Sequence, residues 1–168
     1  SIADEEAVTR SIVVDNPGIK LESFWTADDE IGVFGEQAIN TTLHIDAASI
    51  SKNGKDATFN ALNGIPTGEL LAYHPYMAGA SASGNVLHLT FPATQHYTEV
   101  ERVPQPDPEA CVIVGKGSKG TGISFKNVMA VLKIGQVFAN QTMVKRIEFR
   151  DLSGKAVCGS YTVDLSQN

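Results

Sequence analysis

Apolar and polar residues alternate one by one in several short stretches of the chain. In one of them Leu87, Leu89 and Phe91 alternate with His88 and Thr90. Successive side chains of a β-strand point to opposite faces, so this pattern predicts a strand with one face buried and the other in water. Strands of this kind are typical of antiparallel sheets.

A second alternating stretch, Val144–Arg150, contains Ile147 and Phe149 between charged neighbours. The two apolar side chains would share one face, and the charged side chains would share the other. This pattern predicts another half-buried strand.

Stretches rich in Val, Ile, Phe, Tyr and Thr recur between clusters of Gly, Pro, Asn and Asp, which is the pattern of short strands joined by turns. The predicted strands are Ser11–Val14, Glu30–Phe34, Thr41–Ile45, Ala57–Phe59, Leu70–Tyr76, Val86–Phe91, Cys111–Val114, Ile123–Ile134, Val144–Arg150 and Ala156–Leu165. The best candidate for a helix, Ile123–Phe138, is interrupted by Gly135, and its β-branched residues suit a strand better. The sequence therefore predicts an all-β fold, a two-sheet antiparallel β-sandwich with little helix.

One segment between the predicted strands is rich in proline. Three prolines lie between Pro104 and Pro108, within Val103–Glu109. Because proline lacks the backbone N–H and has a fixed φ, we expect an extended connection here and no ladder strand. Together with Thr94–Arg102 it would form a long loop or a crossover between sheets.

Composition limits the class of protein. The chain has 168 residues, of which 42% are hydrophobic, and this excludes gross disorder. The length fits a single domain with a sizeable core. A net charge of −6 argues against a nucleic-acid partner, which would need a basic surface. No apolar run approaches the length of a membrane-spanning helix.

The segment Gly115–Gly120 matches the G-x-G-x-x-G pattern of dinucleotide-binding loops. That chemistry needs a helix after the loop and an acidic residue about 20 positions further on. The residues after Thr121 are strand-like, and no acidic residue occurs before Glu148. We therefore expect a flexible basic hairpin loop and no nucleotide or other cofactor.

No group of residues has the spacing of a metal or catalytic site. His44 and His88 alternate with apolar residues and are expected to face solvent, and Asp28–Glu30 is expected to be a solvated turn. Cys111 and Cys158 lack the spacing of metal ligands. They are expected to be free, buried thiols, with a disulfide as the alternative.

Several segments, in this order along the chain, resemble the N-terminal domain of the fimbrillin family, the pilus subunits and related surface lipoproteins of Gram-negative anaerobes. No single motif is specific, but together they cover most of the chain between Ser11 and Leu165. The segments that carry the resemblance are Phe24–Phe34, Leu71–Tyr76, Leu87–Gln95, Phe125–Ile134 with Val144–Phe149, and Ser153–Val163.

The resemblance implies a β-sandwich with Greek-key (transthyretin-like) topology. We expect residues 1–10 to be a flexible N-terminal segment and residues 11–168 to be a single β-sandwich domain, the N-terminal domain of a longer protein. Members of the family are exported as lipoproteins and reach the outer membrane or the fimbriae. An Arg-specific protease removes an N-terminal segment, and this makes Arg10 and Ser11 the candidate processing site.

The resemblance also implies a function without catalysis. We expect a cell-surface or fimbrial structural subunit that acts in adhesion and binds other pilus or surface-protein subunits by donor-strand exchange. A host or bacterial surface ligand is a possible further partner. The alternative is a carbohydrate- or peptide-binding module of an outer-membrane assembly, which would use residues around Trp25 or Lys116–Lys119. Considered by itself, Trp25 is expected to be a core residue.

Overall fold

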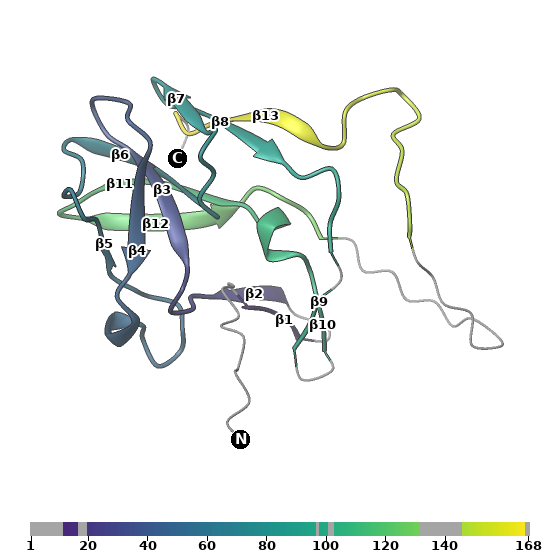
Figure 1. The fold of residues 1–168 in the computed structure, drawn as a ribbon, viewed down its shortest axis with the longest axis horizontal. Coiled ribbons are helices and arrows are strands. Elements are labelled where there is room, and N and C mark those ends of the chain that lie inside the picture. Colours follow the sequence, from purple (N-terminus) through teal and green to yellow (C-terminus); the bar gives the residue numbers. More distant parts are fainter. Residues whose placement is uncertain (1–11, 17–19, 97, 101–102, 132–145, 167–168) are drawn as a thin grey trace.

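The computed structural model describes residues 12–16, 20–96, 98–100, 103–131 and 146–166, and nearly all of their regular structure is β-strand (Figure 1). The six strands of the large sheet lie in the order β12-β11-β6-β3-β4-β5, and those of the small sheet in the order β13-β8-β7. The large sheet contains β3 (Glu30–Phe34), β4 (Thr41–Ile45), β5 (Phe59–Asn60), β6 (Glu69–His74), β11 (Ile113–Ser118) and β12 (Gly122–Asn127), and the small sheet contains β7 (Ser81–Ser83), β8 (Val86–Phe91) and β13 (Gly159–Asp164). The predicted all-β class with two antiparallel sheets is confirmed.

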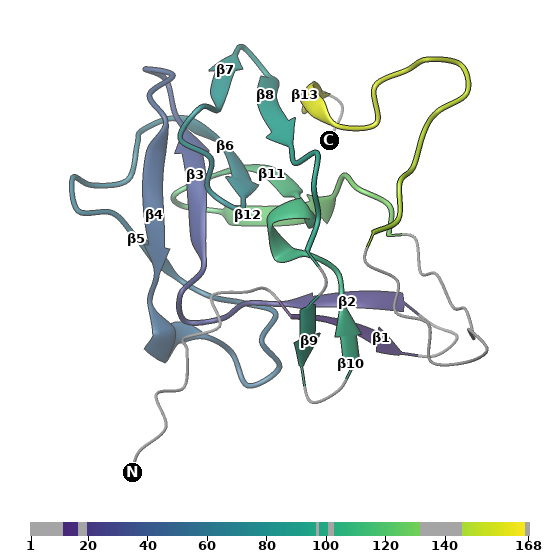
Figure 2. The same ribbon diagram turned by 45° about the vertical axis from the view of Figure 1, so that its right-hand side comes forward.

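Two short ribbons and two 3-10 turns complete the described structure. β1 (Ile12–Asn16) pairs with β2 (Lys20–Phe24), and β9 (Thr98–Val100) pairs with β10 (Val103–Gln105). Figure 2 shows these two ribbons side by side, below the two sheets. The 3-10 turns are η1 (Ala47–Ser49) and η2 (Pro108–Ala110).

The large sheet contains a Greek key. Strands β3, β4 and β5 follow one another and pair in sequence, and β6 then returns to pair with β3 on its other side. The spatial order β6-β3-β4-β5 is the order that defines this motif. The expected Greek-key connection is therefore present.

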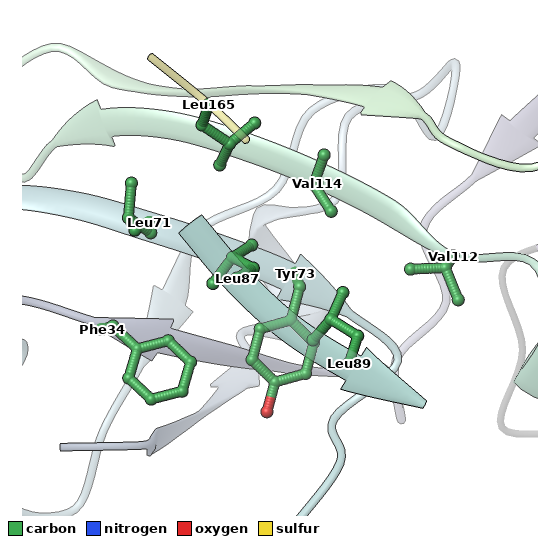
Figure 3. Close-up of a cluster of buried hydrophobic side chains, with 8 residues drawn as sticks. All are labelled: Phe34, Leu71, Tyr73, Leu87, Leu89, Val112, Val114 and Leu165. Atoms are coloured by element: carbon green, nitrogen blue, oxygen red, sulfur yellow. The ribbon is translucent and has the colours of Figure 1, made fainter. Parts of the chain in front are cut away.

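The main core lies between the two sheets, where apolar residues from alternate positions meet (Figure 3). Leu87 and Leu89 of β8 are buried while His88 and Thr90 are exposed, as the alternation predicts. The residues of this cluster are Phe34, Leu71, Tyr73, Leu87, Leu89, Val112, Val114 and Leu165. Their burial fixes which face of each strand points inward.

Tyr73 is the largest fully buried side chain of this core. Its ring stacks on Phe34 with centroids 6.0 Å apart, and its hydroxyl lies 2.9 Å from Asn40 Oδ1 and 2.9 Å from the Met77 carbonyl oxygen. Gly32 is its direct partner on β3, and a Cβ there would overlap the Tyr73 ring. The glycine therefore makes room for the ring.

The glycine-rich segment has an explanation in strand packing. β11 and β12 form the expected hairpin, but Gly115–Ser118 belong to β11 itself, so the prediction of a loop from Gly115 is wrong. A Cβ on Gly115 would lie 2.6 Å from the Ser124 carbonyl oxygen, and one on Gly117 would overlap the Gly122 carbonyl oxygen. The two glycines let β12 approach β11 closely. Strand packing therefore accounts for them without a nucleotide site.

Most predicted strands are present with shifted ends, but one is absent. Residues 146–150 of the predicted strand Val144–Arg150 form no strand, and its first two residues lie outside the described residues. Ile147 and Phe149 are 53% and 58% exposed. The alternation indicates which face a strand would bury, but none of the strands that the structure describes pairs with residues 146–150.

The ends of other strands also differ from prediction. β12 stops at Asn127 although the prediction continued to Ile134, of which 132–134 lie outside the described residues. β13 begins at Gly159 and not at Ala156. Four strands that lack a long apolar run were not predicted, namely β2, β7, β9 and β10.

The proline-rich segment does contain a ladder strand, which corrects the prediction of a plain connection. Val103–Gln105 pairs with β9, and Pro104 lies opposite Glu99. Each of the two strands has only one partner in the described sheets, and an edge position tolerates the missing N–H of proline. After it, Asp107 caps the 3-10 turn Pro108–Ala110 by accepting the Glu109 N–H at 3.1 Å.

Residues 1–11, and with them Arg10 and Ser11, lie outside the described residues, so the division into 1–10 and 11–168 stays a prediction. None of the helices in the described part of the chain is long and apolar enough to cross a membrane.

We predict that Gly32→Ala destabilises the fold by about 1–3 kcal/mol, because the added methyl group displaces the fully buried Tyr73 ring. Urea denaturation measures the free energy of unfolding. Gly120→Ala is the matched control, since no atom of the described residues other than its own neighbours in the chain lies within 4 Å of the position of its Cβ. Equal stability of the two variants would contradict this account of Gly32.

Candidate functional site

The second face of the large sheet is covered in part by a cluster of aromatic rings around Trp25. Phe59 comes from β5 at one edge of the sheet, and Phe125 comes from β12 at the other edge. The ring of Trp25 lies 5.1 Å from the ring of Phe59 and 5.4 Å from that of Phe125, nearly perpendicular to both. The sheet is therefore curled, and Trp25 connects its two edges.

A groove of about 1040 Å³ lies inside this curl. Apolar side chains from the strands form much of its lining, including Ile31, Leu43 and Leu70. Trp25 and the hairpin Lys116–Lys119 both line it, so the fold brings together the two segments that the sequence singles out for binding. The prediction that Trp25 is a core residue holds in part, because it packs against the buried residues of this face but is only half-buried.

The lysines around the groove differ in their surroundings. Lys55 Nζ lies 4.0 Å from the centroid of the Phe24 ring and donates to the Ser23 carbonyl oxygen at 3.1 Å. Lys116 Nζ lies 2.9 Å from a Glu69 carboxylate oxygen and 3.2 Å from Asn85 Oδ1. Lys119 is exposed at the hairpin. The groove thus combines the aromatic rings around Trp25 with the amino groups of these lysines.

Beneath Trp25 the structure places a buried polar pair that sequence reasoning missed. His74 Nε2 lies 3.3 Å from Asp29 Oδ1, and both residues are 4% exposed. The other carboxylate oxygen of Asp29 accepts the Thr26 N–H at 2.8 Å. The ring of Trp25 stands edge-on to the His74 ring, with centroids 5.5 Å apart. His74 Nδ1 is buried, and among the described residues it has no hydrogen-bond partner.

The prediction of a solvated turn at Asp28–Glu30 is therefore wrong for its middle residue. Asp28 and Glu30 are exposed, but Asp29 points inward. No local pattern signals this pair, because its members are 45 positions apart in sequence and meet only through the pairing of β3 with β6.

The other histidines agree with the sequence analysis. His44 and His88 are exposed, and His44 Nδ1 lies 2.9 Å from Glu30 Oε1 on the neighbouring strand. Within the part of the chain that the structure describes, no group of three or more His, Cys, Asp or Glu side chains is arranged to hold a metal ion.

Both cysteines are free, as predicted, but only one is shielded. Cys111 is half-buried, and burial raises the pKa of its thiol to about 11, with a smaller contribution from Asp107. It is therefore protonated and unreactive at neutral pH. Cys158 is exposed, which corrects the prediction that both thiols are buried.

Comparisons with family models, with curated proteins and with solved structures gave no match.

We predict that Asp29→Ala lowers the free energy of unfolding by about 2–4 kcal/mol, because it leaves the buried imidazole of His74 and the Thr26 N–H without their acceptor. The adjacent exposed acid provides the matched control, and Asp28→Ala should change stability by less than about 0.5 kcal/mol. Thermal or urea unfolding of both variants checks this. Similar losses in the two would show that the pair contributes little.

Proposed function

We propose that the protein is a non-catalytic structural subunit of a cell-surface or fimbrial assembly, joined to its neighbours by β-strand addition. The observation that carries the proposal is the segment Arg146–Arg150. It has the alternation of a strand, yet it pairs with no strand of the described structure and leaves Ile147 and Phe149 exposed.

Charged and apolar residues alternate in this segment as they do in a half-buried strand. The guanidinium group of Arg146 pairs with the carboxylate of Glu148 two residues later. Figure 1 shows the backbone of this region extending away from both sheets. A segment of this kind gains backbone hydrogen bonds and apolar burial when it joins a sheet edge.

Sheet edges that could receive a strand are also present. Among the described strands, β5 and β12 end the large sheet, and β7 and β13 end the small sheet. An edge strand exposes unpaired N–H and C=O groups that another chain can pair with. Donor segment and acceptor edges together support an assembly role.

The resemblance to the fimbrillins supports the remaining parts of the proposal. In this view the protein is exported as a lipoprotein precursor and acts in adhesion at the outer membrane or in fimbriae. Cleavage after Arg10 would prepare the chain for assembly, with Ser11 as the new N-terminus.

We predict that the chain associates with increasing concentration and that the backbone amides of Arg146–Arg150 become protected from hydrogen exchange as it does so. Phe149→Lys should weaken association by about tenfold or more, because a charged side chain replaces an apolar one at the buried face of the added strand. Leu152→Lys is the matched control, since Leu152 is 98% exposed and lies outside the alternating segment.

Sedimentation analysis gives the association constants for both variants. A chain that stays monomeric, or one that associates while these amides remain unprotected, would contradict strand addition by this segment.

A second candidate function, a carbohydrate- or peptide-binding module, is favoured by the groove that Trp25 and Lys116–Lys119 share. We predict that a glycan or extended peptide bound there loses about tenfold or more in affinity in Trp25→Ala, because the indole supplies the largest aromatic surface of the groove. Glycan and peptide arrays measure this, with Phe149→Lys as a control outside the groove. Equal binding by both variants would exclude the groove.

A further inference from the structure

Strand β4 has a partner along only half of its outer side. The short strand β5 pairs with it at His44 and Ile45, through Asn60 and Phe59. From Ala61 the chain turns away, and residues 61–67 form a loop that stands apart from β4. The space between this loop and β4 is a cavity of about 630 Å³, which we call the β4 slot.

The register of β4 shows where its backbone groups point. The Ile45 N–H donates to the Asp29 carbonyl oxygen on the β3 side at 3.3 Å, and the Asp46 N–H donates to the Thr58 carbonyl oxygen on the β5 side at 2.8 Å. Backbone groups of successive strand residues point to alternate sides. The N–H and C=O of Thr42 therefore point to the β5 side, into the slot.

On the β5 side of β4, the residue that would pair with Thr42 does not lie opposite it. Continuing the pairing of His44 with Asn60 would put Leu62 opposite Thr42. Leu62 lies in a turn instead and is 93% exposed. No strand of the described structure pairs with Thr42 on this side. The slot thus offers a backbone donor and acceptor to an incoming strand.

Polar residues form much of the lining of the slot, and exposed apolar side chains and one carboxylate lie among them. Ile39 and Leu62 are exposed large hydrophobic residues that line it, and Glu36 adds a carboxylate. A strand that fits here needs apolar side chains on one face and basic side chains near Glu36. As a strand, the segment Arg146–Arg150 would have Ile147 and Phe149 on one face and Arg146, Glu148 and Arg150 on the other, with one more basic than acidic group.

We propose that Arg146–Arg150 of a second copy of the chain inserts as a strand into the β4 slot. Its backbone pairs with Thr42, and its apolar face packs on Ile39 and Leu62. This inference rests on the proposed function, strand addition, and names its donor and its acceptor.

The occupant comes from another copy because one copy cannot fill its own slot. Figures 1 and 2 both place β4 and β5 on one side of the molecule and the region after residue 146 on the opposite side. A contact between two different surfaces of identical chains leaves one donor and one acceptor free at the ends. Such a contact extends into a filament unless it closes into a ring.

The first test removes the backbone donor of the slot. Thr42→Pro deletes an N–H that points away from the β3 ladder, so we expect the fold to survive and self-association to weaken by about tenfold. Thr42→Val keeps the N–H and should associate like the unchanged chain. Circular dichroism and thermal unfolding of both variants establish that they are folded.

The second test needs no proline and uses cross-linking between copies. In a Cys158→Ser background, protein carrying Leu62→Cys is mixed with protein carrying Phe149→Cys and oxidised. We expect a disulfide-linked heterodimer in severalfold higher yield than with Leu152→Cys, a position outside the segment that is more exposed than Phe149.

The outcomes separate the inference from the proposed function. If Phe149→Lys blocks association while Thr42→Pro does not, and the cross-link forms no better than the Leu152→Cys control, the slot is wrong and strand addition uses another edge. If the chain does not associate through Arg146–Arg150 at all, both proposals are overturned.

Discussion

The contact of Trp25 with Phe59 and Phe125 is the interaction on which the large sheet depends. An isolated sheet of six strands has two faces to cover, and here the three-stranded sheet covers only one of them. The other face buries Ile31 and Leu43 because the sheet curls until its two edges meet at one indole ring. Glycines in β11 permit the close approach of β12 that this curl requires.

The curl has consequences at the edges of the sheet. β5 is only two residues long, and the chain leaves β4 before the outer ladder is complete. On the far side of the molecule, an alternating segment has no strand to pair with in the described structure. The described structure thus has both an open strand edge and an unpaired strand-like segment, and the strand addition that we propose would give each of them a partner.

The buried Asp29–His74 pair shows how the same curl accommodates polar groups. Trp25 covers the pair from the side of the groove, while the Thr26 N–H and the imidazole occupy the two oxygens of the carboxylate. Breaking such a pair is costly because it leaves a buried polar group without its partner. The pair therefore fixes the start of β3 against the end of β6, next to the ring that closes the sheet.

Local pattern in the sequence determined the fold class and the inward faces of the strands, since the alternation around Leu87 and Leu89 depends only on the geometry of a strand. It also predicted the β11–β12 hairpin. Tertiary structure decided the rest. Whether Ile147 and Phe149 are buried depends on a neighbouring strand, which an alternation cannot supply. Asp29 and His74 meet, and Trp25 and Lys119 line one groove, only because strands distant in sequence pair and curl, and this depends on packing across the whole sheet.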